Sequence, residues 1–110
     1  MSFEIKPVDG FKRDFKKLAK KYKNIDKDIR EVILELRENP EAGVYLKNDC
    51  YKIRVSNSSN STGKSGGFRV IYYFIDEQNN LYLMNIYSKT QKENISENEL
   101  LELLKINGLD

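Results

Sequence analysis

The first forty residues combine two kinds of hydrophobic spacing. Phe3 and Ile5 alternate with polar neighbours, which predicts a short strand that ends at Pro7. Apolar residues then recur every three or four positions over residues 11–22 and again over residues 25–36, with charged residues between them. This spacing is typical of amphipathic helices, so the sequence predicts a strand followed by two short helices that form a hairpin.

Beyond residue 50 the hydrophobic spacing changes to every second residue. Residues 51–56 alternate between apolar and polar side chains, and residues 67–75 and 81–88 are two longer apolar runs. Residues 76–80, between these runs, are polar turn formers. We therefore expect three strands, of which the last two pair antiparallel.

A third amphipathic helix is predicted near the C-terminus. Ser96 and Glu99 have the spacing of a capping box, and a leucine-rich segment follows them up to Asn107-Gly108. A sheet needs a cover for its apolar face, and the helical hairpin offers a matching apolar stripe. The sequence thus predicts a single α+β domain over residues 1–110, a two-layer sandwich. In it the N-terminal strand and the helix hairpin pack on an antiparallel sheet, a C-terminal helix follows, and one face of the sheet stays open.

The composition excludes several classes of protein. No apolar run in the 110 residues approaches the roughly 18 that a membrane span needs, and residues 1–6 carry no export signal. We therefore expect a cytoplasmic protein that does not contact membranes. Histidine is absent and Cys50 is the only cysteine, so an internal disulfide, a Cys-His catalytic pair and a histidine metal site are all excluded. We predict that the protein uses no metal and no cofactor.

The charges are distributed unevenly along the chain. Residues 1–37 carry eleven Lys or Arg against seven Asp or Glu, whereas residues 93–110 carry Lys105 against five acids. Between residues 44 and 75, five basic residues face Asp49 alone. We interpret the lysine-rich first helix as a solvated face, so the segment 44–75 is the stronger candidate for binding an anion.

A glycine-lysine loop that runs into an apolar strand is the most informative local feature. Lys64 lies in this loop, Gly66-Gly67 follow it, and Arg69 comes early in the strand. Glycines let backbone amides approach a ligand, and a mobile lysine can close over a phosphate, although an ordinary flexible turn has the same composition. We interpret the segment as a phosphate site in which the strand holds the Arg69 guanidinium. An ion pair with a carboxylate is the alternative for this arginine.

Three neighbouring features bear on this site. The run from Ser56 to Thr62 contains only Ser, Asn and Thr, so we expect a mobile loop that is too polar to be buried. Gly63-Lys64-Ser65 resembles the end of a nucleotide-binding P-loop, but Ser58 stands where the first glycine should be and a strand rather than a helix follows, so we reject a nucleotide-binding function. Tyr87 lies two residues before Lys89, where a base could stack on its ring, and core packing is the alternative.

Three segments of the chain carry a resemblance to one toxin superfamily. They are Lys52-Ile53-Arg54-Val55, the run from Gly63 to Phe74, and the run from Tyr82 to Lys89. In this order they resemble the RelE/ParE toxin superfamily, and the closest likeness is to HigB-like RelE toxins. The most specific part is Lys-x-Gly-Gly-x-Arg-hydrophobic-Ile-Tyr, and the predicted elements follow the family's order over nearly the whole chain. Several relatives place a second basic residue where Ser65 stands, so the cationic cluster is thinner here.

The resemblance implies an activity and a set of partners. RelE-type members are toxins of bacterial toxin-antitoxin pairs that enter the ribosomal A site and cut messenger RNA, and a cognate antitoxin blocks them. Cutting RNA without a metal requires the ribose 2′-hydroxyl to attack the adjacent phosphate. The resemblance thus implies a metal-independent endoribonuclease, with the ribosome, messenger RNA and an antitoxin as partners and no cofactor.

The predicted site residues fit this chemistry. Arg54 and Arg69 can hold the phosphate and stabilise the charge that grows on it, with help from Lys64. The general base is left open between Lys89, Lys64, a carboxylate and ribosomal RNA, and Tyr87 is expected to orient the base or donate a proton. The residues expected to bind RNA are Lys52, Lys64 and Lys92.

Two other functions are compatible with the same fold. ParE-type members inhibit DNA gyrase and are not nucleases, and a non-catalytic module would only hold a partner protein. The glycine-lysine loop together with Arg69 favours the nuclease. A sheet face without converging basic groups would favour the binding module.

Overall fold

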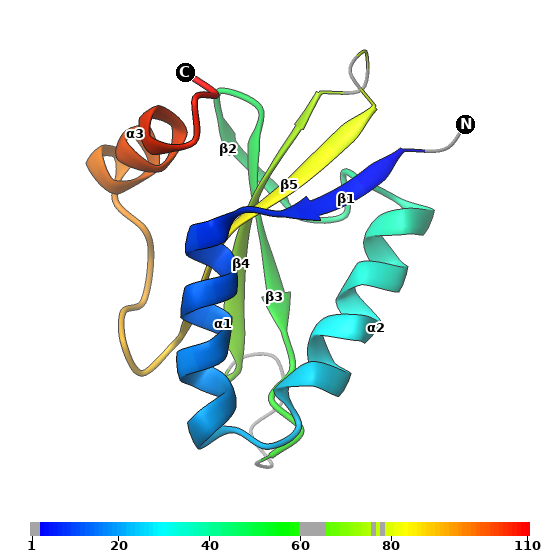
Figure 1. The fold of residues 1–110 in the computed structure, drawn as a ribbon, viewed down its shortest axis with the longest axis vertical. Coiled ribbons are helices and arrows are strands. Elements are labelled where there is room, and N and C mark those ends of the chain that lie inside the picture. Colours follow the sequence, from blue (N-terminus) through cyan, green and yellow to red (C-terminus); the bar gives the residue numbers. More distant parts are fainter. Residues whose placement is uncertain (1–2, 60–65, 76, 78) are drawn as a thin grey trace.

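The computed structural model describes residues 3–59, 66–75, 77 and 79–110 of the chain (Figure 1). Within these residues every helix is too short or too polar to span a bilayer. The elements, in chain order, are β1 (Glu4–Pro7), α1 (Asp9–Lys21), α2 (Ile25–Glu38), β2 (Val44–Lys47), β3 (Cys50–Val55), β4 (Phe68–Ile75), β5 (Asn80–Ser88) and α3 (Glu97–Ile106).

The five strands form one mixed sheet in the order β1-β5-β4-β3-β2. β1 pairs parallel with β5, whereas the other neighbouring strands pair antiparallel. A parallel pair needs a long connection, and everything from α1 to β4 lies between these two strands. The predicted α+β fold class is confirmed, with the correction that the sheet is not purely antiparallel.

The sequence prediction missed β2, an edge strand of four residues. Its Val44 and Tyr45 are both exposed, so no alternation of buried and exposed residues marks it. Asn48 and Asp49 have φ values of 51° and 64° and lie between the paired ends of β2 and β3. Positive φ at both central positions is typical of a type I′ hairpin turn, in which Asn and Asp are favoured. The Asn-Asp pair was therefore the available signal for this hairpin.

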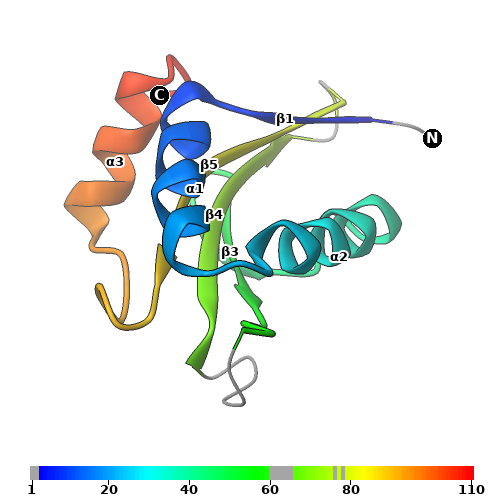
Figure 2. The ribbon, with the colours of Figure 1, turned by 60° about the horizontal axis from the view of Figure 1, so that its bottom comes forward.

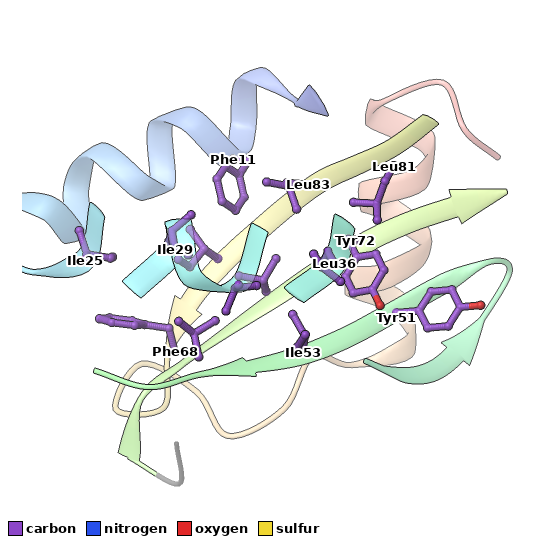
Figure 3. Close-up of a cluster of buried hydrophobic side chains, with 14 of the residues drawn as sticks. Phe11, Ile25, Ile29, Leu36, Tyr51, Ile53, Phe68, Tyr72, Leu81 and Leu83 are labelled. Atoms are coloured by element: carbon purple, nitrogen blue, oxygen red, sulfur yellow. The ribbon is translucent and has the colours of Figure 1, made fainter. Parts of the chain in front are cut away.

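The two N-terminal helices cover one face of the sheet. Figure 3 shows their buried side chains packed against those of the strands. This packing agrees with the predicted apolar stripes of both helices. The side chains labelled there are Phe11, Ile25, Ile29, Leu36, Tyr51, Ile53, Phe68, Tyr72, Leu81 and Leu83.

The helix α3 covers part of the opposite face. In Figure 2, α2 and α3 lie on opposite sides of the sheet. The capping box is confirmed, because Ser96 Oγ accepts from the Glu99 amide at 3.1 Å and the Ser96 amide donates to Glu99 Oε1 at 2.9 Å. Leu100 and Leu104 are buried in the same cluster as Ile71 of β4. The expectation that this face stays open is therefore wrong, because the leucine stripe of α3 finds its apolar cover there.

Tyr72→Phe is expected to lower the free energy of unfolding by about 1–2 kcal/mol. The Tyr72 hydroxyl donates to the Pro40 carbonyl at 2.9 Å and accepts from the Gly43 amide at 3.0 Å. Burial raises the pKa of Tyr72 to about 12, so the hydroxyl stays protonated. Phenylalanine would leave both backbone groups without this partner. Urea denaturation measures the difference.

Tyr82→Phe is the matched control for this measurement. Tyr82 lies on the neighbouring strand, and its hydroxyl makes no hydrogen bond with other residues that the structure describes. The control variant should therefore unfold at the wild-type midpoint. Equal midpoints for all three proteins would show that the two hydrogen bonds of Tyr72 contribute nothing to stability.

Candidate functional site

Arg54, Arg69 and Tyr87 lie in one row across three adjacent strands. Arg54 of β3 is the cross-strand partner of Arg69 of β4, and Arg69 is the partner of Tyr87 of β5. Directly opposed residues project from the same face, with Cβ atoms about 5 Å apart. Ile71 and Tyr73 share the face of Arg69 by alternation and belong to the cluster that includes the α3 leucines. The row therefore lies on the α3 side of the sheet.

The two arginines of this row differ in burial. Arg54 is exposed, whereas only 4% of Arg69 is accessible and its Nη1 donates to the Phe68 carbonyl at 3.1 Å. Burial, and then the charge of Arg54, lowers the pKa of the Arg69 guanidinium, which still remains charged because arginine starts from so high a value. Two like charges held on adjacent strands oppose each other, and an anion bound at both would relieve this repulsion.

Tyr87 is a buried member of the row. Only 3% of it is accessible, and Lys92 Nζ lies 4.9 Å from the centre of its ring, a cation-π contact. Burial raises the pKa of Tyr87, while Arg69 and the nearby Ile95 amide act in the opposite direction. The hydroxyl makes no hydrogen bond of ordinary geometry with the described residues. In this arrangement a base could stack on the ring only by displacing Lys92, and the protonated hydroxyl is suited to donate a hydrogen bond.

Two of the lysines predicted to bind RNA, Lys52 and Lys92, are held by α3 and the segment that leads into it. Lys52 Nζ donates to Asn94 Oδ1 at 3.0 Å, and Lys92 Nζ forms an ion pair with Glu99 Oε2 at 2.8 Å. Both lysines are half-buried. The structure therefore places Lys52 and Lys92 on the α3 side of the sheet together with the row.

Acids of α3 neutralise part of the basic segment. Glu97 forms an ion pair with Lys47 of β2, and Glu99 forms one with Lys92. The hydrogen bond from Lys92, followed by that from the Ser96 amide, lowers the pKa of Glu99 to about 2. The pair of Lys47 and Glu97 thus joins opposite charges that are 50 positions apart along the chain.

The two remaining predicted lysines are Lys89 and Lys64. The side chain of Lys89 is exposed, and its backbone amide donates to the Gly67 carbonyl at 3.1 Å, beside the start of β4. Lys64 lies outside the described residues. The structure thus brings Lys89 to the same end of the sheet as Arg69, but it does not describe Lys64.

Gly67 packs closely against the end of β3. A Cβ atom at this position would lie 1.9 Å from the carbonyl oxygen of Val55. Real Cβ contacts are never this short, so any larger residue must displace the backbone of one strand. Close strand packing is therefore a reason for glycine here that the sequence analysis did not consider.

The polar run after β3 is partly buried, which the sequence analysis did not expect. Asn57 is only 3% exposed, and its Oδ1 accepts from the Ser59 amide at 2.9 Å. The Ser58 amide donates at 3.0 Å to the buried carboxylate of Asp28 in α2. These hydrogen bonds satisfy polar groups that would otherwise oppose burial. The loop segment 56–59 is thus fixed to α2, and residues 60–65 lie outside the described part.

Sequence reasoning missed a polar contact between β5 and α1. Asn85 Nδ2 donates to Asp14 Oδ2 at 2.9 Å, and Asn85 precedes Tyr87 by two residues. Asn85 is the one polar residue inside the apolar run 81–87, and that was a usable signal. Asp14 gave none, because it is one of many charged residues on α1.

Comparisons with known proteins agree with the fold. The toxin RelE of E. coli carrying two arginine-to-alanine mutations, in the free state, has 18% identity and a TM-score of 0.63, with 96% of this chain and 98% of that chain covered. The isolated E. coli RelE toxin has 21% identity and a TM-score of 0.59, with 96% and 99% covered. A chain of the intact E. coli RelBE toxin-antitoxin complex has 19% identity and a TM-score of 0.57, with 77% and 94% covered.

Identities this low show a common fold, and the family itself follows from a separate match. The family described as the RelE toxin of the RelE / RelB toxin-antitoxin system matches residues 11–109, which is nearly the whole chain. The superfamily that the sequence resembled is thereby confirmed. The chain belongs to the RelE family, the toxins of toxin-antitoxin systems.

Proposed function

We propose that this toxin is a ribosome-dependent endoribonuclease that cuts messenger RNA in the A site and thereby stops translation. The row of Arg54, Arg69 and Tyr87 across β3, β4 and β5 carries this proposal. An exposed arginine and a buried one, held next to each other on a rigid sheet, are suited to bind a phosphate of the message. A module that only holds a partner protein would need no such convergence. We also propose that, within the RelE/ParE superfamily, this toxin is most similar to the HigB-like RelE toxins.

The proposed reaction is an internal transfer of the phosphoryl group. The ribose 2′-hydroxyl attacks the adjacent phosphorus, the bond from phosphorus to the 5′-oxygen breaks, and a 2′,3′-cyclic phosphate and a 5′-hydroxyl result. A base takes the proton of the 2′-hydroxyl, and an acid returns a proton to the leaving 5′-oxygen. Arg54 and Arg69 stabilise the charge that grows on the phosphate oxygens, and one such donor is typically worth about 3 kcal/mol.

The burial and the contacts of the remaining site residues suggest their roles in this reaction. Tyr87, with its raised pKa, acts as a hydrogen-bond donor to the phosphate or the leaving oxygen. Lys89 is the exposed candidate for the base at the row's end of the sheet, and Lys64 stays a candidate from the sequence. Lys52 and Lys92 bind the RNA backbone after exchanging Asn94 and Glu99 for phosphates.

The proposed partner in the resting state is a cognate antitoxin. One solved structure contains the E. coli RelBE toxin-antitoxin complex, and another contains mutant E. coli RelE with an antitoxin RelBc peptide at 18% identity to this chain and a TM-score of 0.60. We expect an acidic or amphipathic antitoxin segment to cover the basic row or to lie along a sheet edge, because it must compete with RNA for the same cations.

Production of the chain without an antitoxin is expected to arrest bacterial growth and to leave cuts in ribosome-bound messages. Primer extension on translated messages maps these cuts, and the same RNA without ribosomes should stay intact. Intact messages together with relaxed, gyrase-poisoned plasmid would identify a ParE-like gyrase inhibitor instead. Intact messages with normal plasmid would leave only a binding module.

A further inference from the structure

The turn that follows β5 satisfies a backbone edge that the sheet leaves open. The pairing of β1 with β5 ends at Leu83, whereas β5 continues to Ser88. The Lys89 amide donates to the Gly67 carbonyl on the β4 side, so the backbone groups of Ser88 point to the opposite side, which β1 no longer covers. Because Ser88 is only 4% exposed, its amide and carbonyl need partners within the protein.

Gln91 supplies both of these partners. Its side-chain Oε1 accepts from the Ser88 amide at 2.8 Å, and its own amide donates to the Ser88 carbonyl at 3.0 Å. Ser88 and Gln91 have the spacing of a capping box, in which a Glu or Gln side chain reaches back to the backbone amide three residues earlier. Here the spacing closes a turn with two hydrogen bonds instead of opening a helix.

The closed turn fixes the backbone from which Lys92 reaches Tyr87. Lys92 follows Gln91 directly, and its amide donates to the same Ser88 carbonyl at 3.4 Å. From this position its Nζ lies 4.9 Å from the centre of the Tyr87 ring. A lysine side chain is a flexible four-carbon stem, so its cation keeps one place only where its backbone is held.

The ion pair of Lys92 with Glu99 is not sufficient to fix this cation. The Glu99 side chain is 48% exposed, and ion pairs of exposed groups hold a side chain only weakly. The two hydrogen bonds between Gln91 and Ser88 are short and lie beside a buried residue. The turn is therefore the firmer of the two constraints on Lys92.

We propose that Gln91 is a positioning residue of the candidate site, which holds Lys92 against Tyr87 by closing the turn 88–91. Its side-chain oxygen is engaged by the Ser88 amide, so it acts through the backbone of the turn. This inference rests on the proposed function for the reaction that Lys92 and Tyr87 serve. The geometry of the turn does not depend on that reaction, so the two can be tested separately.

Gln91→Met is the test, because methionine has nearly the same length and offers the Ser88 amide only a weak acceptor. In the wild type, the Tyr87 ring should shift the NMR signals of the Lys92 side chain upfield. Gln91→Met should move these signals towards those of a free lysine and slow message cutting at saturating toxin about 10–100-fold. Asn98→Leu also replaces an exposed amide by an apolar side chain, and as the matched control it should change neither.

Two further variants show through which groups Gln91 acts. Gln91→Glu keeps an acceptor for the Ser88 amide, as in a capping box, so its Lys92 signals and its maximal cutting rate should match the wild type. Its negative charge should only raise the toxin concentration needed for half the maximal rate, because RNA is an anion. In a Lys92→Met background, Gln91→Met should slow cutting no further, since the two changes remove the same contact.

Three results would overturn the proposal. One is unchanged Lys92 signals in Gln91→Met, and slower cutting without a change of signals would indicate that Gln91 contacts the RNA itself. Another is a Gln91→Glu variant that behaves like Gln91→Met, because the acceptor would then be irrelevant. The third is the full loss of rate on adding Gln91→Met to Lys92→Met. If the wild type cuts no message but Gln91→Met moves the Lys92 signals, the nuclease function falls and the positioning of Lys92 stands.

Discussion

Arg54→Ala is expected to slow message cleavage by about 10²–10³-fold while the protein stays folded. The loss corresponds to removing one positioned donor from a charged transition state. Arg54 is exposed at the edge of the row, so its truncation leaves neither a cavity nor a buried group without a partner. The rate of cutting on programmed ribosomes in a purified translation system measures the effect, and circular dichroism confirms the fold.

A matched control distinguishes the effect of losing a charge at the row from the effect of losing one positive charge anywhere on the protein. Arg30 of α2 is also an exposed arginine, and its ion pair with Asp26 on the same helix contributes only about 0.3–0.5 kcal/mol. Arg30→Ala therefore removes the same charge far from the row and should cut at the wild-type rate. If both variants were equally slow, general attraction to RNA would explain the loss. Wild-type cutting by Arg54→Ala would exclude Arg54 from the site.

Arg69→Ala is expected to abolish both cutting and growth arrest, but its interpretation is harder. The side chain is buried and donates to the Phe68 carbonyl, so truncation also removes packing and a hydrogen bond. Its stability must be measured alongside its activity. Arg54 is for this reason the sharper test, although Arg69 is the more rigidly held of the two.

The row itself could be predicted from the sequence because strands have a simple period. Alternation placed Arg69 on one face with Ile71 and Tyr73, and this face is the observed one. The pairing of Arg54 with Arg69 depends on the register between β3 and β4, which the hydrophobic pattern constrains to the correct face. The convergence of basic groups was therefore within reach of sequence reasoning.

Contacts between elements that are distant along the chain could not be predicted from the sequence. Asn85 and Asp14 are 71 positions apart, and nothing in either segment indicates that α1 passes beside β5. The burial of Asn57 likewise depends on a loop being fixed by Asp28 from another element. Polar residues are normally exposed, so composition alone gives the wrong expectation wherever two of them satisfy each other.

The position of α3 was the largest error, and its cause is physical. A leucine stripe shows which side of a helix must be buried, but not which surface receives it. The receiving surface here is the face that also carries the row, so α3 and its acids lie next to the catalytic candidates. If the row binds RNA as proposed, we expect RNA to reach its buried members, Arg69 and Tyr87, more easily when α3 is held less firmly.

Leu104→Ala is expected to weaken the docking of α3 by about 2–5 kcal/mol, the usual loss for a buried leucine. Leu104 is 1% exposed in the cluster that also contains Cys50. Burial raises the pKa of the Cys50 thiol to about 12, so the thiol does not react with alkylating reagents while α3 is docked. Because Cys50 is the only cysteine, its alkylation rate reports opening of this cluster. The rate should rise about 30-fold or more, since the expected loss starts at about 2 kcal/mol and every 1.4 kcal/mol is a factor of ten.

Leu101→Ala provides the comparison within the same helix. Leu101 is 41% exposed, so its truncation should change neither the alkylation rate nor the stability by much. If Leu104→Ala alone accelerates alkylation and also exposes Lys92 to exchange with RNA, α3 is the element that limits access to the row. Acceleration of alkylation without tighter RNA binding would show that the row is already accessible with α3 in place. Equal rates in both variants would mean that Cys50 is protected by the strands and that α3 contributes no cover at all.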